Sequence, residues 1–377
     1  MILGINASNL RAGGGVTHLV EILRVSEPRS YGFEKVIVWG GEETLSKVTE
    51  RDWLHKIHDP LLDRSFIYRL FWQTFRLKKL AKQSGCDILF VPGGSNASRF
   101  KPVVTMSRNM LPFEWREMRR FGWSLFTVKL LLLRVIQSHT FRNANGVIFL
   151  TKYARNRVLN VTGSLRGKSM IIPHGINPRF FRLPRRQRLC KEFIETEPCR
   201  VLYVSIVDAY KHQTEVAIAV ARLRSEGVFI VLELIGPSAK GINRLNKTLS
   251  QIDPKSSFIK YRGSVPYEKL DEFYDNVDIS VFASSCENMP NILLECMAAG
   301  LPMACSSMGP MPEILGDAGV YFNPEDANEI ALALYKLIDS PSLREQSALT
   351  AYLRAQQYSW ERCADGTFGF LADIAQI

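Results

Sequence analysis

Two glutamates bracket the part of the chain whose residue types are best suited to chemistry. Glu287 and Glu295 flank Asn-Met-Pro-Asn-Ile-Leu-Leu, which carries no other charge. Pro290 fits the first turn of a helix, where its missing N–H costs nothing. The N–H groups at a helix start bind anions, and carboxylates accept hydrogen bonds from hydroxyl groups. This spacing predicts a ligand with hydroxyl groups on both sides of an anionic bridge.

The apolar pattern around the glutamates indicates which elements hold them. The short apolar run 278–283 is typical of a buried strand, and the run 292–298 continues with helical spacing until Gly300-Leu301-Pro302 ends it. We therefore expect Glu287 in the loop before a helix and Glu295 one to two turns inside that helix.

Chain length and cysteine usage restrict the class of protein. A chain of 377 residues predicts two domains. Lys129 and Arg134 interrupt the longest apolar stretch, Leu125–Ile136, so it is too short and too charged to span a membrane. The first residues resemble a strand and not a signal peptide. Seven scattered cysteines without a CxxC pair predict a reduced, cytoplasmic protein.

Positive charge is concentrated in the first half. Residues 51–200 contain 29 lysines and arginines against nine acids, whereas residues 201–377 contain 14 against 22. Aromatic and basic residues alternate in 64–72 and in 115–123, and the latter leads into Leu125–Ile136. This composition suits an interfacial surface on an anionic membrane. An ordinary solvated face over a core stripe is the alternative. No RRM, KH, helix-turn-helix or zinc pattern favours nucleic acid.

Short apolar runs alternate with helix-like stretches in both halves. This alternation predicts an α/β fold of two Rossmann-like, doubly wound parallel sheets, with ligands at the carboxyl ends of the strands and a cleft between the two domains. The Pro- and Arg-rich segment 180–198 is predicted to connect them. The expected strands are 2–6, 35–40, 87–92, 102–107, 146–151 and 170–173, then 200–206, 229–236, 258–261, 278–283, 302–305 and 319–322.

Three further features lie at predicted strand ends. Gly13-Gly14-Gly15 lets backbone approach a ligand, although His18 excludes a GxGxxG motif. A surface turn is the alternative for these glycines. Lys211 follows the first strand of the second half, where a cation can reach phosphates. His174 is either a hinge or cleft residue or a structural histidine.

We expect neither a metal nor another cofactor. The sequence has no DxD, no HExxH and no Cys/His cluster. A diphosphate can instead be held by lysine and helix N–H groups, which this chain provides.

The segment 282–302, with its Glu287-x7-Glu295 frame, resembles the signature of the family 4 retaining glycosyltransferases, which have the GT-B fold. The resemblance continues through 309–314, and Tyr358-Ser359-Trp360-Glu361 is similar to the start of the family's last helix. Weaker matching stretches occur in the expected order at the glycine loop, 144–151, 172–176, Lys211 and 258–265.

The resemblance implies a role for each matching residue. Glu287 would face hydroxyl groups of the donor sugar, and Glu295 would bind the ribose of the nucleotide. The diphosphate would be held by Lys211, with Gly14 and Gly15 approaching it from the other domain. Gly263 would border the base. The remaining donor-binding positions implied are Asn288, Met289, Pro290, Asn291 and Ile292.

The resemblance also implies three parts of the chain. Residues 1–185 would form an acceptor-side domain, 196–358 a nucleotide-sugar donor domain, and 359–377 a helix that crosses back to the first domain.

Two positions depart from the family pattern. Ile206 stands where the family often has a phosphate-binding arginine, five residues before Lys211. The family also often has a histidine near the end of a central strand of the first domain, where this chain has Ser107-Arg108-Asn109. Either Arg108 or Asn109 would take that role, and we prefer Asn109 as a third catalytic residue beside Glu287 and Lys211.

The sequence thus predicts a retaining, metal-independent hexosyltransferase that moves a sugar from a nucleotide sugar to a saccharide or lipid-linked acceptor. The basic first half suggests assembly of O-antigen or a similar cell-surface polysaccharide, peripherally at the inner face of the cytoplasmic membrane. A nucleotide-sugar epimerase or phosphorylase-like relative of the same fold, and a non-catalytic binder of sugar nucleotides or polyanions, are the alternatives. The donor sugar, the base, the acceptor and the oligomeric state stay open.

Overall fold

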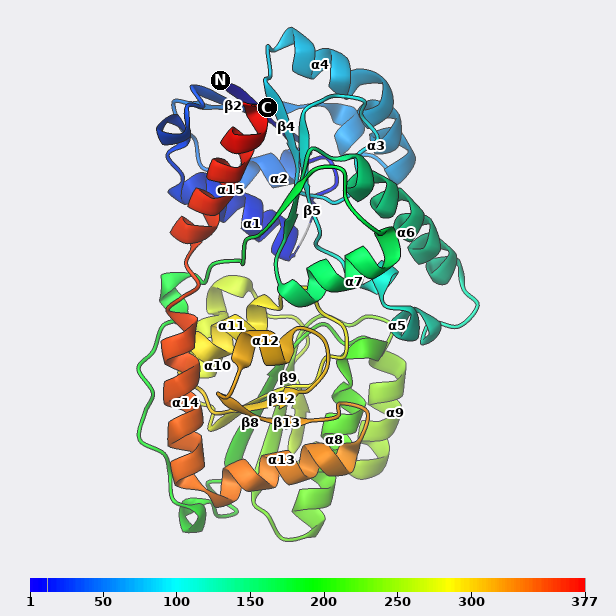
Figure 1. Ribbon diagram of the computed structural model, residues 1–377. Helices are drawn as coiled ribbons and strands as arrows, with labels where there is room; N and C mark the ends of the chain where they lie inside the picture. Colours follow the sequence, from blue (N-terminus) through cyan, green and yellow to red (C-terminus); the bar gives the residue numbers. More distant parts are fainter. Residues whose placement is uncertain (12, 377) are drawn as a thin grey trace. The chain divides into compact units, whose positions relative to one another are not determined.

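The computed structural model describes residues 1–11 and 13–376. The chain forms two compact units, shown in Figure 1. Unit 1 consists of residues 1–175 together with 358–377, and unit 2 consists of residues 176–357.

Unit 1 is built on a seven-stranded sheet in the order β3-β2-β1-β4-β5-β6-β7, in which every pair is parallel. The chain order reverses between β1 and β4, which lie side by side, so this is the switch point where loops diverge at the carboxyl edge. The strands are β1 (Ile2–Asn6), β2 (Lys35–Gly40), β3 (Leu54–His58), β4 (Ile88–Val91), β5 (Val103–Met106), β6 (Gly146–Phe149) and β7 (Lys168–Ile171).

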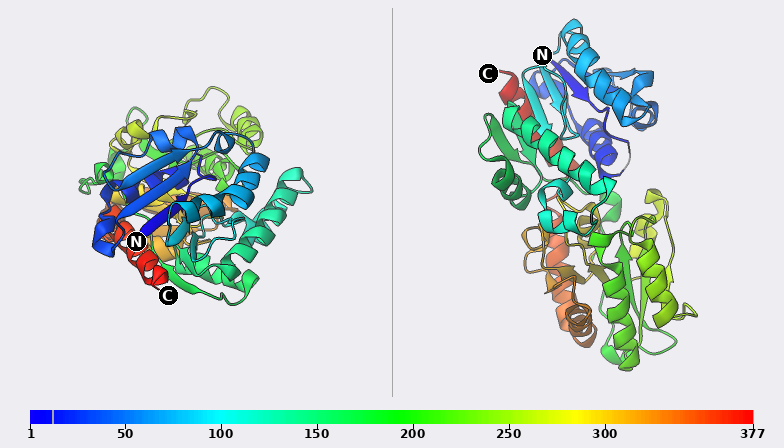
Figure 2. Two further views of the ribbon diagram at one scale, coloured as in Figure 1. Left: turned by 90° about the horizontal axis from the view of Figure 1, so that it is seen from above. Right: turned by 90° about the vertical axis from the view of Figure 1, so that its right-hand side faces the viewer.

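Helices cover this sheet, and the last of them comes from the far end of the sequence. Helix α15 packs against α1, β4 and β6, and Figures 1 and 2 show it in red beside the strands of unit 1. The helices are α1 (Gly14–Val25), α2 (Glu42–Ser46), α3 (Phe66–Trp72), α4 (Lys78–Gln83), α5 (Trp115–Arg119), α6 (Leu125–Asn143), α7 (Lys152–Thr162) and α15 (Trp360–Ala375). A π-helical turn, Gln73–Leu77, joins α3 to α4.

Unit 2 repeats the design with a six-stranded parallel sheet in the order β10-β9-β8-β11-β12-β13. Its switch point lies between β8 and β11. The strands are β8 (Cys199–Val204), β9 (Ile230–Ile235), β10 (Ile259–Tyr261), β11 (Ile279–Phe282), β12 (Met303–Ser306) and β13 (Gly319–Phe322). The helices are α8 (Gln213–Ser225), α9 (Ile242–Ile252), α10 (Leu270–Tyr274), α11 (Asn291–Ala298), α12 (Met311–Leu315), α13 (Ala327–Asp339) and α14 (Pro341–Ala355).

Each strand expected from the apolar runs is present, and the predicted α/β fold with two parallel sheets is confirmed. Strand β3 is not among the strands predicted from the apolar runs. This strand lies at the sheet edge and reads Leu-His-Lys-Ile-His, and three of its five residues are exposed. An edge strand of this kind lacks the continuous apolar run that marks a buried parallel strand.

The predicted connection 180–198 lies within unit 2, because the division falls between Gly175 and Ile176. Arginine side chains bind this segment to the unit. Arg185 donates hydrogen bonds to the carbonyls of Asp275 and Val277. Arg344, which is fully buried, donates to carbonyls at the end of α13 and to the carbonyl of Arg188. The arginines of the predicted connection therefore fix the segment to unit 2.

Among the described residues, each helix is either too short or too polar to cross a membrane.

Two matched glycine substitutions test how the start of α15 packs against unit 1. An alanine Cβ at Gly175 would lie 2.1 Å from the backbone nitrogen of Trp360, which cannot yield without moving the helix start. At Gly369, inside α15, the nearest atom to a new Cβ is 3.6 Å away. We expect Gly175→Ala to destabilise the protein by at least about 2 kcal/mol. Gly369→Ala should be neutral or stabilising by up to about 1 kcal/mol.

Urea unfolding followed by circular dichroism measures both effects. Equal midpoints for the two variants would show that Gly175 is not packed against the start of α15.

Candidate functional site

A buried ion pair lies at the carboxyl edge of the unit 2 sheet. Lys211 ends a short 3₁₀ turn after β8, and Glu287 lies in the loop after β11. Because β8 and β11 pair in parallel, these two loops leave the sheet side by side. The Lys211 ammonium forms an ion pair with the Glu287 carboxylate. Their side chains are only 10% and 14% exposed, so the pair is held mostly away from water.

Aromatic rings and a tyrosine hydroxyl fix Lys211 in place. Its ammonium lies 5.1 Å from the ring centroid of Tyr210 and 5.7 Å from that of Phe282. The Tyr203 hydroxyl donates a hydrogen bond of 2.6 Å to the Lys211 carbonyl. The lysine is therefore preorganised and not a mobile surface cation.

The loop that carries Glu287 leads directly into helix α11. The helix begins at Asn291, and Pro290 is its N-cap with extended backbone, one residue earlier than the predicted position in the first turn. Proline suits this place because its ring disfavours helical backbone at the preceding residue and it has no N–H to satisfy. The first turn of α11 contains no acidic residue. Its N–H groups thus provide anion-binding capacity beside the ion pair.

Glu295 lies one turn into α11, as predicted, and is 3% exposed. Its carboxylate accepts hydrogen bonds from the hydroxyl groups of Tyr267, at 3.1 Å, and Tyr274, at 3.2 Å. Burial raises the pKa of Glu295 to about 7, although the two tyrosine hydrogen bonds act in the opposite direction. The carboxyl is therefore poised between its neutral and charged forms near neutral pH.

A cavity of about 180 Å³ lies at the same sheet edge. Tyr267, the start of α11 at Ile292, and Ile206 contribute to its wall. Ile206 thus adds apolar surface where the family pattern often has an arginine. Gly263 accepts a hydrogen bond of 2.8 Å from the nitrogen of Gly236, another wall residue, and adopts φ +70°, a conformation that favours glycine.

In unit 1, the glycine segment is the start of a helix. Gly13 is the N-cap of α1, with φ 66° and ψ −160°, and Gly14 and Gly15 are its first two residues. Asn109, which the sequence analysis preferred as a catalytic residue, uses its side-chain oxygen to accept a hydrogen bond of 3.1 Å from the nitrogen of Leu111. Arg108 is the neighbour that reaches the glycines, because its guanidinium donates to the Gly14 carbonyl.

His174 is 3% exposed and belongs to an aromatic cluster in unit 1. Its ring centroid lies 5.2 Å from that of His18 and 5.8 Å from that of Trp360. This packing fits a structural histidine. His174 also precedes Gly175, where the chain leaves unit 1, so the hinge alternative stays a prediction.

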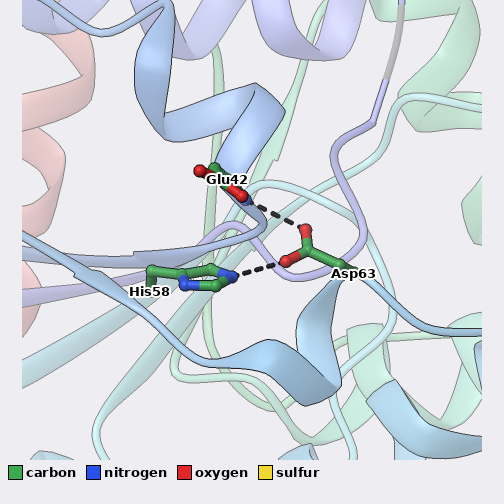
Figure 3. A group of neighbouring side chains, drawn as sticks. All are labelled: Glu42, His58 and Asp63. Carbon is green, nitrogen blue, oxygen red and sulfur yellow. Dashed lines mark hydrogen bonds and ion pairs between the residues drawn. The ribbon is translucent and has the colours of Figure 1, made fainter.

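One group of side chains in the described part of the chain could gather around a cation. Glu42, His58 and Asp63 bring ligand atoms within 4.8 Å of one another, and all three residues are exposed (Figure 3). The Asp63 carboxylate already accepts hydrogen bonds from the backbone nitrogen of Glu42 and from the His58 ring (Figure 3). Asp63 therefore serves the start of α2, a structural role that explains the group.

Two partners of Glu295 were not predicted from the sequence. Tyr267 and Tyr274 hold Glu295, but nothing in the sequence around them marks them as more than core or surface tyrosines. Arg108 was considered and ranked below Asn109. Only its hydrogen bond to Gly14, 94 residues away, distinguishes it.

Two family models match the chain, and together they span most of it. Residues 198–340 match a model described as "Glycosyl transferases group 1", and residues 12–180 match one described as "Glycosyltransferase Family 4". These two matches show that the protein is a glycosyltransferase, and its two parallel sheets are those of the GT-B type. Within this type, the chain belongs to family 4.

Individual relatives agree with this assignment. The O-antigen chain mannosyltransferase B of Escherichia coli is 33% identical over 113 residues, which are 30% of each chain. The matched stretches span 30% of this relative and 57% of a D-inositol 3-phosphate glycosyltransferase of Streptosporangium roseum.

Solved structures resemble almost the whole chain. A sucrose-phosphate synthase from Thermosynechococcus elongatus has a TM-score of 0.74 at 17% identity, covering 97% of both chains. The HepE protein of Anabaena, solved in complex with UDP, has a TM-score of 0.67 at 15% identity, covering 98% of this chain and 97% of that one. Identities this low are informative about the fold alone.

The raised pKa of Glu295 makes the stability of the protein depend on pH. In the folded state the carboxyl holds its proton up to about pH 7, whereas its ordinary pKa is 4.5. The contribution of the neutral carboxyl to the free energy of unfolding is thus fully present below pH 4.5, and it is lost as the pH rises through 7. Glu295→Gln keeps a neutral, isosteric group, so the variant should equal wild type at pH 4 and exceed it by roughly 3 kcal/mol at pH 8.

The free energies of unfolding of both proteins, measured in urea from pH 4 to pH 9, give this difference. Glu345→Gln, at an exposed site on α14, should show none of it. A pH-independent difference between Glu295→Gln and wild type would contradict a raised pKa.

Proposed function

We propose that the protein is a retaining, metal-independent glycosyltransferase that moves a hexose from a nucleotide sugar to a lipid-linked saccharide. We further propose that it acts in cell-surface polysaccharide assembly, as a peripheral protein on the inner face of the cytoplasmic membrane. The observation that carries the proposal is the Lys211–Glu287 pair beside the start of α11, with Glu295 one turn further on.

This arrangement fits a nucleotide sugar from end to end. Lys211 and the N–H groups of α11 suit the diphosphate, and Glu287 is placed to accept hydrogen bonds from the hydroxyl groups of a sugar. Glu295 can accept from the ribose, with the cavity beside Tyr267 left for the base. The Anabaena relative of the same fold binds UDP, which supports a nucleotide as ligand.

In the proposed reaction, one bond at the anomeric carbon of the sugar breaks and another forms. The bond from that carbon to the phosphate oxygen breaks, and a bond to the acceptor hydroxyl oxygen forms on the same face. The hydroxyl proton passes to the departing phosphate, so no protein nucleophile is needed. Lys211 and the α11 N–H groups stabilise the negative charge that builds on the leaving diphosphate. When the donor binds, the Glu287 carboxylate accepts hydrogen bonds from sugar hydroxyl groups in place of its ion pair with Lys211. Its negative charge then offsets the positive charge that builds on the sugar ring.

A lipid-linked acceptor is supported by the surface of unit 1. Many large apolar side chains of α3 to α6 are exposed, and Trp123 and Leu125 are almost fully so. Basic residues such as Arg64, Lys79 and Lys129 accompany them. Figures 1 and 2 show α3 and α6 along the outside of the unit. The exposed apolar residues of this basic–apolar surface are Phe66, Ile67, Tyr68, Leu70, Phe71, Phe75, Trp115, Trp123, Leu125, Val128, Leu131, Leu132 and Val135.

Burying such a surface in the headgroup region of an anionic bilayer would remove apolar area from water and pair its cations with lipid phosphates. The relative from Escherichia coli is an O-antigen chain mannosyltransferase, and this supports a polysaccharide product.

A transfer assay tests the reaction. Labelled UDP-, GDP- and dTDP-sugars are incubated with the protein, a bacterial lipid extract and EDTA. We expect label in the lipid fraction, with NMR showing the anomeric configuration of the donor retained. Glu287→Gln should lower kcat about 10²- to 10³-fold, because it removes a charge that acts in the transition state.

Lys211 needs a paired control because its removal alone leaves Glu287 buried without a partner. The double variant Lys211→Met with Glu287→Gln removes both charges, so it should recover stability but not activity. Interconversion of the donor without transfer would identify an epimerase, and binding without turnover would identify a non-catalytic binder. Either result would overturn the proposal.

Vesicle flotation tests the membrane surface. The wild type should bind vesicles that contain phosphatidylserine at low salt and be released as salt rises, because its cations are screened. Replacing both Trp123 and Leu125 by serine should reduce binding at least tenfold. In the matched control, serine replaces Leu349 and Leu353, which are about half exposed on α14 of unit 2. This variant should bind vesicles like the wild type. Failure of the wild type to float at low salt would contradict a membrane location.

A further inference from the structure

His212 has a backbone conformation that residues other than glycine rarely adopt. Its φ and ψ are 52° and 30°, in the left-handed region, where a Cβ crowds the following carbonyl oxygen. In the described part of the chain, Ser256 is the one other non-glycine residue with positive φ, and it is exposed. His212 is only 3% exposed. Glycine would adopt this conformation without strain, which indicates that the imidazole makes contacts that outweigh the cost.

The imidazole forms a hydrogen bond with the loop after β11. Its Nε2 atom lies 3.0 Å from the hydroxyl oxygen of Ser285, which is also buried. The two residues are 73 positions apart in the sequence. His212 directly follows Lys211, and Ser285 comes two residues before Glu287. This hydrogen bond therefore joins the two loops that carry the ion pair, next to both of its members.

A buried carboxylate orients the ring from its other side. The Oε2 atom of Glu215 lies 3.6 Å from Nδ1 of His212, and its Oε1 atom lies 2.5 Å from the guanidinium of Arg244. Burial would raise the pKa of Glu215, but the interaction with His212 and the charge of Arg244 outweigh burial and hold this pKa below its ordinary value. In the neutral imidazole, the charged carboxylate favours the tautomer with its proton on Nδ1. Nε2 is then left to accept the hydrogen bond from Ser285.

The same two loops are also joined through the backbone. The nitrogen of Ser285 donates a hydrogen bond of 2.9 Å to the carbonyl of Tyr210, the residue before Lys211. The parallel pairing of β8 with β11 lies directly behind this contact. Loss of the Ser285 hydroxyl leaves both of these connections in place. We therefore expect such a loss to let the loops shift against each other without unfolding them.

We propose that His212 is a positioning residue for the transfer reaction, and that its hydrogen bond to Ser285 fixes the loops after β8 and β11 against each other. The separation of these loops in turn places Lys211 and Glu287 on one donor molecule. This inference rests on the proposed function and deepens it. A displacement of reacting groups by about 1 Å can cost about 10²-fold in rate, so a side chain that does not contact the donor can still control kcat.

Two substitutions at His212 separate the effect of the side chain from that of the backbone. His212→Gly suits the left-handed conformation but deletes the imidazole. It should lower kcat at least about tenfold and leave KM for the donor within about threefold, because the donor-binding groups of α11 are untouched. His212→Gln keeps an amide near the position of Nε2, so it should recover most of kcat with a backbone as strained as that of the wild type. If backbone strain alone mattered, this order would be reversed.

Ser285→Ala removes the same hydrogen bond from its other side and should lower kcat to a similar extent. The double variant of Ser285→Ala with His212→Gly should fall no further than either single variant, because both act through one bond. Ser347→Ala is the matched control. It deletes a similarly buried hydroxyl of α14, which donates to the Ala318 carbonyl, so it should lower the melting temperature and leave kcat unchanged. All rates are measured at a temperature at which circular dichroism shows every variant to be folded.

The outcomes separate a positioning role from a structural one. If His212→Gly and Ser285→Ala keep kcat within about twofold of wild type and only melt earlier, the bond is structural and the inference is overturned. An additive loss in the double variant would also overturn it, because the two side chains would then act separately. In either case, a loss of transfer in Glu287→Gln would leave the proposed function standing. Absence of transfer by the wild type itself would remove both.

Discussion

The pairing of Lys211 with Glu287 is the constraint on which the rest of the unit 2 site depends. Two charges that are largely removed from water are stable only when each is close to the other and to further polar groups. Here 76 residues separate the partners along the chain. The sheet order makes the contact possible, because β8 and β11 lie side by side and point the same way. A substitution that shifts β8 against β11 would therefore break the ion pair, even where the substituted residue makes no contact with a ligand.

The two glutamates of the α11 segment differ in their surroundings, and this difference is the basis on which different roles are proposed for them. Glu287 is paired with the Lys211 ammonium, and its side chain is 14% exposed. Glu295 is enclosed with two tyrosine hydroxyl groups, and burial raises its pKa to about 7. In the proposed reaction, the carboxylate paired with Lys211 is the one beside a sugar with positive character. A buried carboxyl with a pKa near 7 suits the binding of hydroxyl groups, because it can accept hydrogen bonds without leaving a buried charge uncompensated.

The basic residues of the first half have at least two distinct roles. The arginines of the connection, such as Arg185, donate to backbone carbonyls of unit 2 and so contribute to packing. Those around α3 to α6 accompany exposed apolar side chains, and Arg108 lies at the start of α1. A charge count cannot separate these roles, because a guanidinium that donates to backbone carbonyls and one on an exposed surface have the same formal charge.

The sequence by itself determined the alternation of strands and helices, and hence the two parallel sheets. A buried parallel strand needs an uninterrupted apolar run, and such a run can be read from the chain. It also placed Glu287 before α11 and Glu295 within it, because a helix start is a local property of the chain. Tertiary structure alone decided the partners, namely Tyr267 and Tyr274 on Glu295, and Arg108 on Gly14. These contacts join distant segments, and the packing of sheets and loops selects them, which no local pattern records.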